Sequence, residues 1–257
     1  MVTAELSFRV VRRVDDETIG DAVDRLVEAL QRNGQVLSEE WPIAREGRRV
    51  RTYVSIPEPG ALRARRKSRW VSAARLGLRQ AGLRLTRVTN LGSEPVALDV
   101  CRHKAPSSYV LYTTGTSMES PLRCGECFDP VPLYRVPHTD ECGTYEDIIF
   151  WRRNYQRFDG IWFASRAGER FAYRCLSRFD SDLSAAGREV CERIRKLTGK
   201  RVYYYLYRHD GRSRDAERRR HCPSCQGEWL LDEPWHGCFD FRCDRCGLVS
   251  NIAHDVR

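Results

Sequence analysis

Four cysteines near the end of the chain have the spacing of a metal site. Cys222 and Cys225 form one C-x-x-C pair, Cys243 and Cys246 form a second, and seventeen residues separate the pairs. Each C-x-x-C turn can direct two thiolates at one point, so two turns supply the four ligands of a tetrahedral zinc ion. The sequence therefore predicts one zinc site here. Four free cysteines spaced this way by chance are the alternative.

A closed set of four thiolates leaves no coordination position for water or substrate, so this site is predicted to be structural. Residues 228–241 have the pattern of a hairpin and residues 247–253 that of a third strand, which together predict a zinc ribbon. A module this small cannot fold on its own core, and the metal must supply much of its stability. We expect Trp229, Phe241 and Cys238 to be packing residues.

Another C-x-x-C pair, Cys124 and Cys127, predicts a second zinc site. Upstream, Cys101 and His103 stand in a Cys-x-His arrangement that completes a set of three thiolates and one imidazole. Unligated cysteines around a glycine-centred turn are the alternative interpretation. The competing ligands are Cys142 and His138.

The chain has 257 residues and eleven cysteines. An odd number of cysteines in a chain of this length favours metal binding over a disulfide framework. The first eleven residues alternate polar and apolar side chains and lack the apolar core of a signal peptide. Near-continuous apolar runs are too short for a transmembrane helix. We therefore expect a cytoplasmic protein.

The formal net charge is +9, which favours anionic partners. Two basic segments are candidates for contacts with nucleic-acid phosphates. The first comprises Arg63, Arg65, Arg66, Lys67 and Arg69. The second comprises Arg212, Arg214, Arg218, Arg219 and Arg220, of which the last three are the candidate contacts. A solvated surface is the alternative for each. Most of the tyrosines at 203–205 and 207 are expected in the core, because alternation along a strand buries half of its side chains.

Hydrophobic periodicity predicts an α+β protein with three domains. In residues 1–98, alternating strands at 4–10, 50–56 and 83–91, helices at 15–33 and 68–81 and an extended segment at 35–43 give the order βαββαβ of a ferredoxin-like domain. Residues 99–211 are predicted to be an α+β middle domain stapled by zinc, with a helix at 182–197 and a strand at 202–207. Residues 212–257 are predicted to be a linker and the zinc ribbon, and the linker signal begins at residue 208.

The motifs of common catalytic sites are absent from the sequence. It contains no nucleophile elbow, no phosphate-binding glycine loop and no H-E-x-x-H motif. We therefore predict that the protein is not an enzyme.

Short stretches spread along the chain carry a family resemblance, at residues 33–35, 40–43, 111–114, 120–127, 130–135, 203–208, 222–225, 239–246 and 250–253. Through them the chain resembles, over nearly its whole length, a bacterial family of uncharacterised proteins that are described as zinc-ribbon-containing, with nucleic-acid binding suggested. The resemblance implies a ribbon at the four C-terminal cysteines. Members often carry Cys-x-Cys where this chain has Cys101 and His103.

Charge, ribbon and resemblance together predict a non-catalytic zinc-binding protein that binds RNA or DNA through arginines. The alternative is a protein-interaction module, such as an immunity or antitoxin-type protein that blocks a protein partner. An enzyme with a cleft between the first two domains is the third interpretation.

Overall fold

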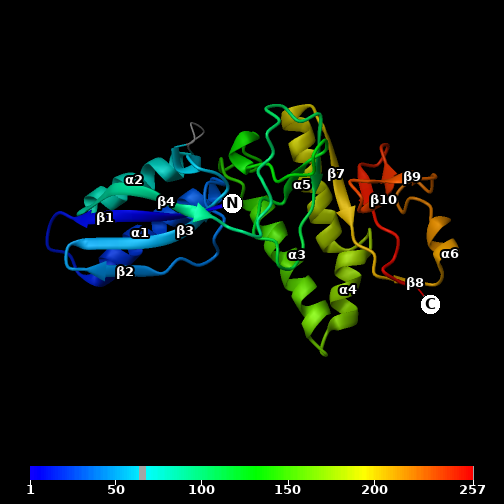
Figure 1. The fold of residues 1–257 in the computed structure, drawn as a ribbon, viewed down its shortest axis with the longest axis horizontal. Helices are drawn as coiled ribbons and strands as arrows, with labels where there is room; N and C mark the ends of the chain where they lie inside the picture. Colours follow the sequence, from blue (N-terminus) through cyan, green and yellow to red (C-terminus); the bar gives the residue numbers. More distant parts are fainter. Residues whose placement is uncertain (64–67, 257) are drawn as a thin grey trace. The chain divides into compact units, whose positions relative to one another are not determined.

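The computed structural model describes residues 1–63 and 68–256 (Figure 1). The chain forms two compact units. Unit 1 contains residues 1–100, 118–120 and 130–146, and unit 2 contains residues 101–117, 121–129 and 147–257. Both units combine helices with β-sheet, so the predicted α+β class is confirmed. No helix in the described ranges is long and apolar enough to cross a membrane.

Unit 1 is built from a four-stranded sheet and two helices. In chain order these are β1 (Val2–Val10), α1 (Asp16–Arg32), β2 (Ile43–Glu46), β3 (Arg49–Ile56), α2 (Arg69–Gln80) and β4 (Leu83–Ser93), with a short 3₁₀ helix, η1 (Ala61–Arg63), before α2. The strand order is β2-β3-β1-β4, and every neighbouring pair is antiparallel. The predicted βαββαβ element order is confirmed. Residues 35–43 were predicted to be an extended segment, but only the last of them, Ile43, belongs to a strand.

Local signals in the sequence set the ends of both helices. The Asp15 carboxylate accepts a hydrogen bond from the Thr18 backbone N–H, and the Ser68 hydroxyl accepts one from that of Val71. The alternating apolar residues of β1 and β3 face one side, where they pack against apolar residues of α1 and α2. The other side of the sheet therefore carries the polar residues of these strands.

Unit 2 is built around a six-stranded mixed sheet with strand order β6-β5-β7-β11-β10-β9. Its strands are β5 (Ser108–Leu111), β6 (Leu122–Cys124), β7 (Arg201–Leu206), β9 (Leu230–Trp235), β10 (Phe239–Cys243) and β11 (Leu248–Ser250). Strands β8 (Asp210–Gly211) and β12 (Asp255–Val256) form a separate parallel pair. The predicted hairpin and third strand near the C-terminus are β9, β10 and β11. Because β11 pairs in parallel with β7, these strands extend the sheet of the middle region.

The helices of unit 2 are α3 (Glu146–Ala164), α4 (Glu169–Ser177), α5 (Asp182–Thr198) and the short α6 (Arg214–Arg218). Helix α5 packs closely on β7, since a Cβ atom added at Gly187 would lie 2.2 Å from the Tyr204 ring. Tyr203, Tyr204 and Tyr205 are buried, as predicted. The predicted linker from residue 208 instead contains β8 and α6, and the reason is the buried Glu217 described below.

Candidate metal centres

The four C-terminal cysteines come together in unit 2. Cys243 is the last residue of β10, Cys246 lies in the turn to β11, and Cys222 and Cys225 lie in the turn between α6 and β9. Their sulfur atoms all lie within 4.8 Å of one another, and the Cys225 and Cys243 sulfurs are 3.7 Å apart. These four residues, called centre B here, could hold a metal ion.

The second predicted set also comes together. Cys124 ends β6, Cys127 follows in the next turn, and Cys101 and His103 lie in the segment before β5. All four ligand atoms lie within 4.8 Å of one another, and the Nδ1 atom of His103 is 3.6 Å from both the Cys101 and the Cys124 sulfur. These four residues, called centre A, could also hold a metal ion.

All three C-x-x-C turns have the same backbone feature. The residue directly after the second cysteine has a positive φ, with 63° at Phe128, 58° at Gln226 and 63° at Gly247. In the first two turns this residue also donates its N–H to the carbonyl of the first cysteine, at 2.9 Å. A left-handed backbone conformation costs conformational free energy in Phe and Gln. Its recurrence therefore indicates that the surrounding structure holds these turns in place.

Backbone N–H groups point at the thiols of centre A. Burial raises the pKa of the Cys101 thiol, while the His103 N–H donates to the sulfur and opposes that rise. Burial likewise raises the pKa of Cys127, and the Asp129 N–H, which donates to its sulfur, opposes that rise. The Glu126 N–H lies 3.4 Å from the Cys124 sulfur. These donors stabilise the charged thiolate, which is the form that ligates metal.

Centre B has the same pattern. Burial raises the pKa of Cys222, although its sulfur accepts hydrogen bonds from the backbone N–H groups of residues 224 and 225. Burial also raises the pKa of Cys243, to about 12. The pKa of Cys225 is lowered to about 7, chiefly because the Gly227 N–H donates to its sulfur. Both centres therefore present partly buried sulfurs whose negative charge is stabilised by the local backbone.

One histidine outside both ligand sets connects the two halves of unit 2. His236 lies in the turn between β9 and β10, and its Nε2 is 3.1 Å from the carbonyl oxygen of Gly125, inside the centre A turn. Its ring stacks on Phe128 with centroids 5.1 Å apart. Glu126 is a second supporting residue, because its carboxylate accepts a hydrogen bond from the Ser107 N–H at 3.0 Å. No spacing rule in the sequence marks either residue.

The two alternative ligands predicted for the second zinc site, Cys142 and His138, have different environments from the four residues of centre A. Cys142 is exposed, and its carbonyl oxygen accepts a hydrogen bond from the Trp70 indole at 3.1 Å. The Nε2 atom of His138 lies 2.9 Å from the side-chain oxygen of Asn33. Both residues belong to unit 1, and neither belongs to a group of metal-ligating side chains among the described residues.

The predicted phosphate-contacting residues differ in exposure. Arg63 and Arg69 are exposed in unit 1, whereas Arg65, Arg66 and Lys67 lie outside the described residues. Arg218 and Arg219 are exposed at the end of α6 in unit 2. These four arginines are free to meet an anionic partner.

Arg220 has a packing role instead. Its Nε lies 3.0 Å from a carboxylate oxygen of Glu217, which is 2% exposed, and its guanidinium lies 4.4 Å from the centroid of the Phe241 ring. Arg208 pairs with the same carboxylate at 2.7 Å. A carboxylate this deeply buried needs such partners, so Arg220 holds α6 against the sheet. Trp229 and Phe241 are buried beside it, as predicted.

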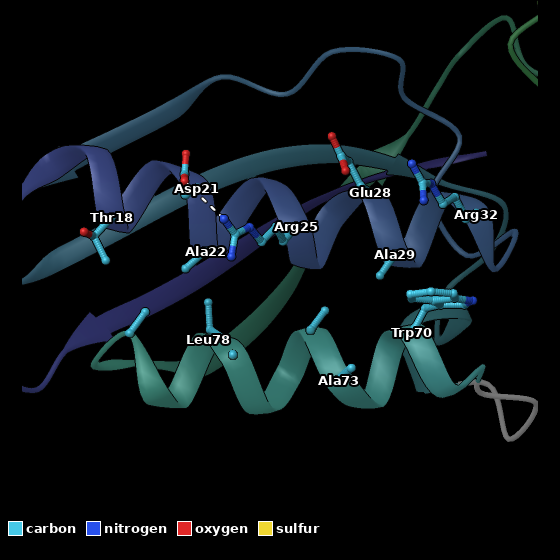
Figure 2. Close-up of a pocket in the computed structure, with 13 residues that line it drawn as sticks. Thr18, Asp21, Ala22, Arg25, Glu28, Ala29, Arg32, Trp70, Ala73 and Leu78 are labelled. Atoms are coloured by element: carbon cyan, nitrogen blue, oxygen red, sulfur yellow. Dashed lines mark hydrogen bonds and ion pairs between the residues drawn. The ribbon is translucent and has the colours of Figure 1, made fainter.

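Unit 1 has a groove of about 560 Å³ between α1 and α2 (Figure 2). Small side chains such as Ala29 and Ala73 leave this space, and Trp70 lies at one end (Figure 2). Asp21 and Arg25 form an ion pair on the α1 side. The described lining residues include no cysteine or histidine, so the groove does not offer the ligand types of the two metal centres.

Three family models match the chain in succession. All are described as domains of unknown function: DUF8589 over residues 1–92, DUF2310 over residues 103–207 and DUF8594 over residues 211–256. A solved structure from Deinococcus radiodurans, provisionally described as an antibiotic biosynthesis monooxygenase, aligns with 39% of this chain and 99% of its own at 12% identity. Its TM-score of 0.27 is too low to carry an argument about fold or activity.

Two relatives from Haemophilus influenzae are both described as uncharacterised proteins. One is 30% identical over 264 residues, which cover 98% of each chain. The other is 34% identical over 188 residues, which cover 72% of this chain and 88% of the relative. The chain therefore belongs to the bacterial family of unknown function that includes these two H. influenzae proteins.

Proposed function

We propose that the protein is a non-catalytic zinc-binding protein, with one structural zinc ion in each centre, that binds nucleic acid through exposed arginines. The observation that carries the zinc assignment is the spacing of the ligand atoms. A tetrahedral zinc ion separates two thiolate sulfurs by about 3.8 Å, and a sulfur from an imidazole nitrogen by about 3.6 Å. The corresponding distances are 3.7 Å in centre B and 3.6 Å, twice, in centre A.

The ligand sets support a structural role for the metal. Four protein ligands close a tetrahedral site, so neither zinc ion would offer a position to substrate. A disulfide is a poor alternative, because its sulfurs would lie about 2.05 Å apart. In this proposal strands β9, β10 and β11 with centre B form a zinc ribbon, and centre A staples the middle region. The β2-β3-β1-β4 order of unit 1 supports the finer assignment as a ferredoxin-like domain.

Charge supports nucleic acid as the partner. The formal net charge is +9, and Arg63, Arg69, Arg218 and Arg219 are exposed. Guanidinium groups suit phosphate oxygens because they can donate two parallel hydrogen bonds. Reduced cysteines also fit the cytoplasm, where a bacterial nucleic-acid-binding protein would work.

Fluorescence anisotropy of the zinc-loaded protein tests the proposal. The probes are single-stranded RNA, single-stranded DNA and duplexes of each, with salt raised from about 50 to 200 mM. We expect micromolar or tighter binding that persists near physiological salt and prefers one nucleic acid. Binding that disappears by about 150 mM salt, or that shows no preference, would refute nucleic acid as the specific partner.

A protein partner is the second candidate, and one observation favours it. The ends of α3 and α4 expose large apolar side chains, with Phe163 83% exposed, Phe171 64% and Ile161 38%. Such a patch is typical of a surface that binds another protein. With one purified partner, this interpretation predicts a stoichiometric complex that the double variant Phe163→Ser/Phe171→Ser abolishes. It also predicts no effect of that variant on nucleic-acid affinity.

A further inference from the structure

The open face of the sheet in unit 1 concentrates arginines. Alternate residues of β1, β3 and β4 point away from the helices, and these include Arg9, Arg49, Arg51, Arg84 and Arg87. The three strands contain these five arginines and only one acidic residue, Glu5. Helices α1 and α2, on the opposite face, together have five acidic residues and five arginines. The open face is therefore positive relative to the helical face of the same unit.

Strand pairing brings these arginines into rows. Arg9 lies directly opposite Arg49 on β3 and Arg84 on β4. Ser7 lies directly opposite Arg51 and Arg87. Side chains of directly opposed residues are neighbours, and like charges in such positions destabilise a sheet. The fold thus tolerates a repulsion that a bound anion would relieve.

These guanidinium groups are available to a ligand. Arg51 pairs with Glu46 at 3.3 Å, whereas no described carboxylate lies within ion-pair distance of Arg9, Arg49 or Arg87. A hollow of about 620 Å³ lies on this face, lined by Arg9, Arg48, Arg49, Arg51 and Arg87 with Glu5 among them. The half-buried Tyr53 lies on the same face, directly opposite Glu5 on β1.

We propose that this open sheet face binds a single-stranded nucleic acid, with phosphates on the arginine rows and one base stacked on Tyr53. The inference rests on the proposed function and adds a binding surface outside the two predicted basic segments. Phosphates match the unpaired guanidinium groups, and stacking on Tyr53 requires an unpaired base. A second copy of the chain is a poor occupant, because its own face would oppose five arginines with five more.

The test compares two double variants by anisotropy with a fluorescein-labelled single strand of about 12 nucleotides, as RNA and as DNA. Arg9→Gln/Arg87→Gln neutralises the sheet face. Arg25→Gln/Arg79→Gln removes the same charge from exposed positions on α1 and α2 of the same unit. We expect the first variant to weaken binding about tenfold or more and to reduce the magnitude of the salt slope by about 1.4, while the second leaves both nearly unchanged.

Two further measurements separate folding and stacking from charge. The Tm of the sheet-face variant should equal or exceed that of the wild type at low salt, because the substitutions relieve like-charge repulsion. Tyr53→Leu should weaken single-strand binding about fivefold or more and leave the salt slope unchanged. A variant that binds poorly because it is misfolded would instead show a lower Tm.

Each remaining outcome identifies what has failed. Equal losses in both double variants, or no loss in either, would overturn the assignment of this face while nucleic-acid binding itself stands. A duplex bound as tightly as the single strand would overturn the single-stranded assignment. A wild-type protein that binds none of the probes would overturn the proposed function and this inference together.

Discussion

The Nε2 atom of His236 lies 3.1 Å from the carbonyl oxygen of Gly125. Since the carbonyl can only accept, the imidazole donates this hydrogen bond. The contact joins the tip of the β9–β10 hairpin, which leads to Cys243, to the turn that carries Cys124 and Cys127. The stability of centre A should therefore depend on the β9–β10 hairpin.

The His236 contact predicts a selective effect on zinc retention. His236→Ala removes both the hydrogen bond and the ring that stacks on Phe128, so the centre A turn loses support. We expect one of two zinc ions to be released to a chelating dye at least about tenfold faster, since outer-shell partners typically contribute 10–100-fold to metal affinity. His221→Ala is the control, because His221 is exposed although it adjoins Cys222. Unchanged release kinetics would show that the contact does not support the centre.

Gly247 should tolerate no side chain. Its φ is +63°, and an added Cβ would lie 2.9 Å from the carbonyl oxygen of Val202, which is backbone and cannot easily move. Gly247→Ala is expected to lower the free energy of unfolding by about 1–3 kcal/mol. Gly227→Ala is the matched control, since its Cβ would meet only the Cys225 sulfur, at 3.5 Å. Equal denaturant midpoints for the two variants would contradict the close packing of this turn on β7.

The buried carboxylate of Glu217 predicts that two adjacent arginines behave differently. Arg220→Gln leaves that carboxylate with one cationic partner, Arg208, and should destabilise the protein by about 2–3 kcal/mol. Arg219→Gln changes an exposed side chain and should alter stability by less than about 0.5 kcal/mol. Denaturant unfolding followed by circular dichroism measures both. Similar losses in the two variants would refute the packing role of Arg220.

The partly buried carboxyl of Asp159 predicts that the Asp159→Asn variant is more stable than the wild type, by an amount that depends on pH. Burial raises the pKa of its carboxyl, although the Gly115 N–H donates to it. The native state therefore holds this proton more tightly than the unfolded state, and the resulting stability is lost as the pH rises through the folded pKa. Asp159→Asn keeps an acceptor oxygen without the charge, so its Tm should exceed that of the wild type by about 2 °C at neutral pH.

The pH profile provides the control for Asp159. The difference in Tm between Asp159→Asn and the wild type should shrink as the pH is lowered from neutral through the raised pKa of the carboxyl, because the wild-type carboxyl then takes up its proton. Both proteins must keep their zinc over this range, which absorption of a released-zinc indicator can verify. A difference in Tm that is constant with pH would mean that the carboxyl does not titrate as described.

The ligand sets could be predicted from the sequence because C-x-x-C turns are local structures. Spacing alone brings Cys222 near Cys225, and the same holds for the other two pairs. Local patterns also predicted the helices, whose caps at Asp15 and Ser68 lie within three residues of the groups they bond. Centre A needed more, since spacing left Cys142 and His138 as competing ligands, and only the tertiary structure brings Cys101 and His103 to Cys124 and Cys127.

The surface chemistry was harder to predict because it depends on strand pairing and burial. Arg9, Arg49 and Arg87 are far from one another in the sequence, and they share one face only after β1 pairs with β3 and β4. Arg220 belongs to a basic run in the sequence, yet its side chain packs against Glu217 and Phe241. A cluster of charges along the chain is therefore a weaker guide to a binding surface than alternation within strands.

The most direct test of the central claim is the zinc content of the intact chain, measured by native mass spectrometry alongside the denatured mass. The account predicts two zinc ions per chain. It also predicts that Cys101→Ser and Cys243→Ser each retain one ion, while Cys142→Ser retains both. A wild-type chain with one zinc ion would contradict centre A as a metal site, and a folded chain with none would contradict the account as a whole.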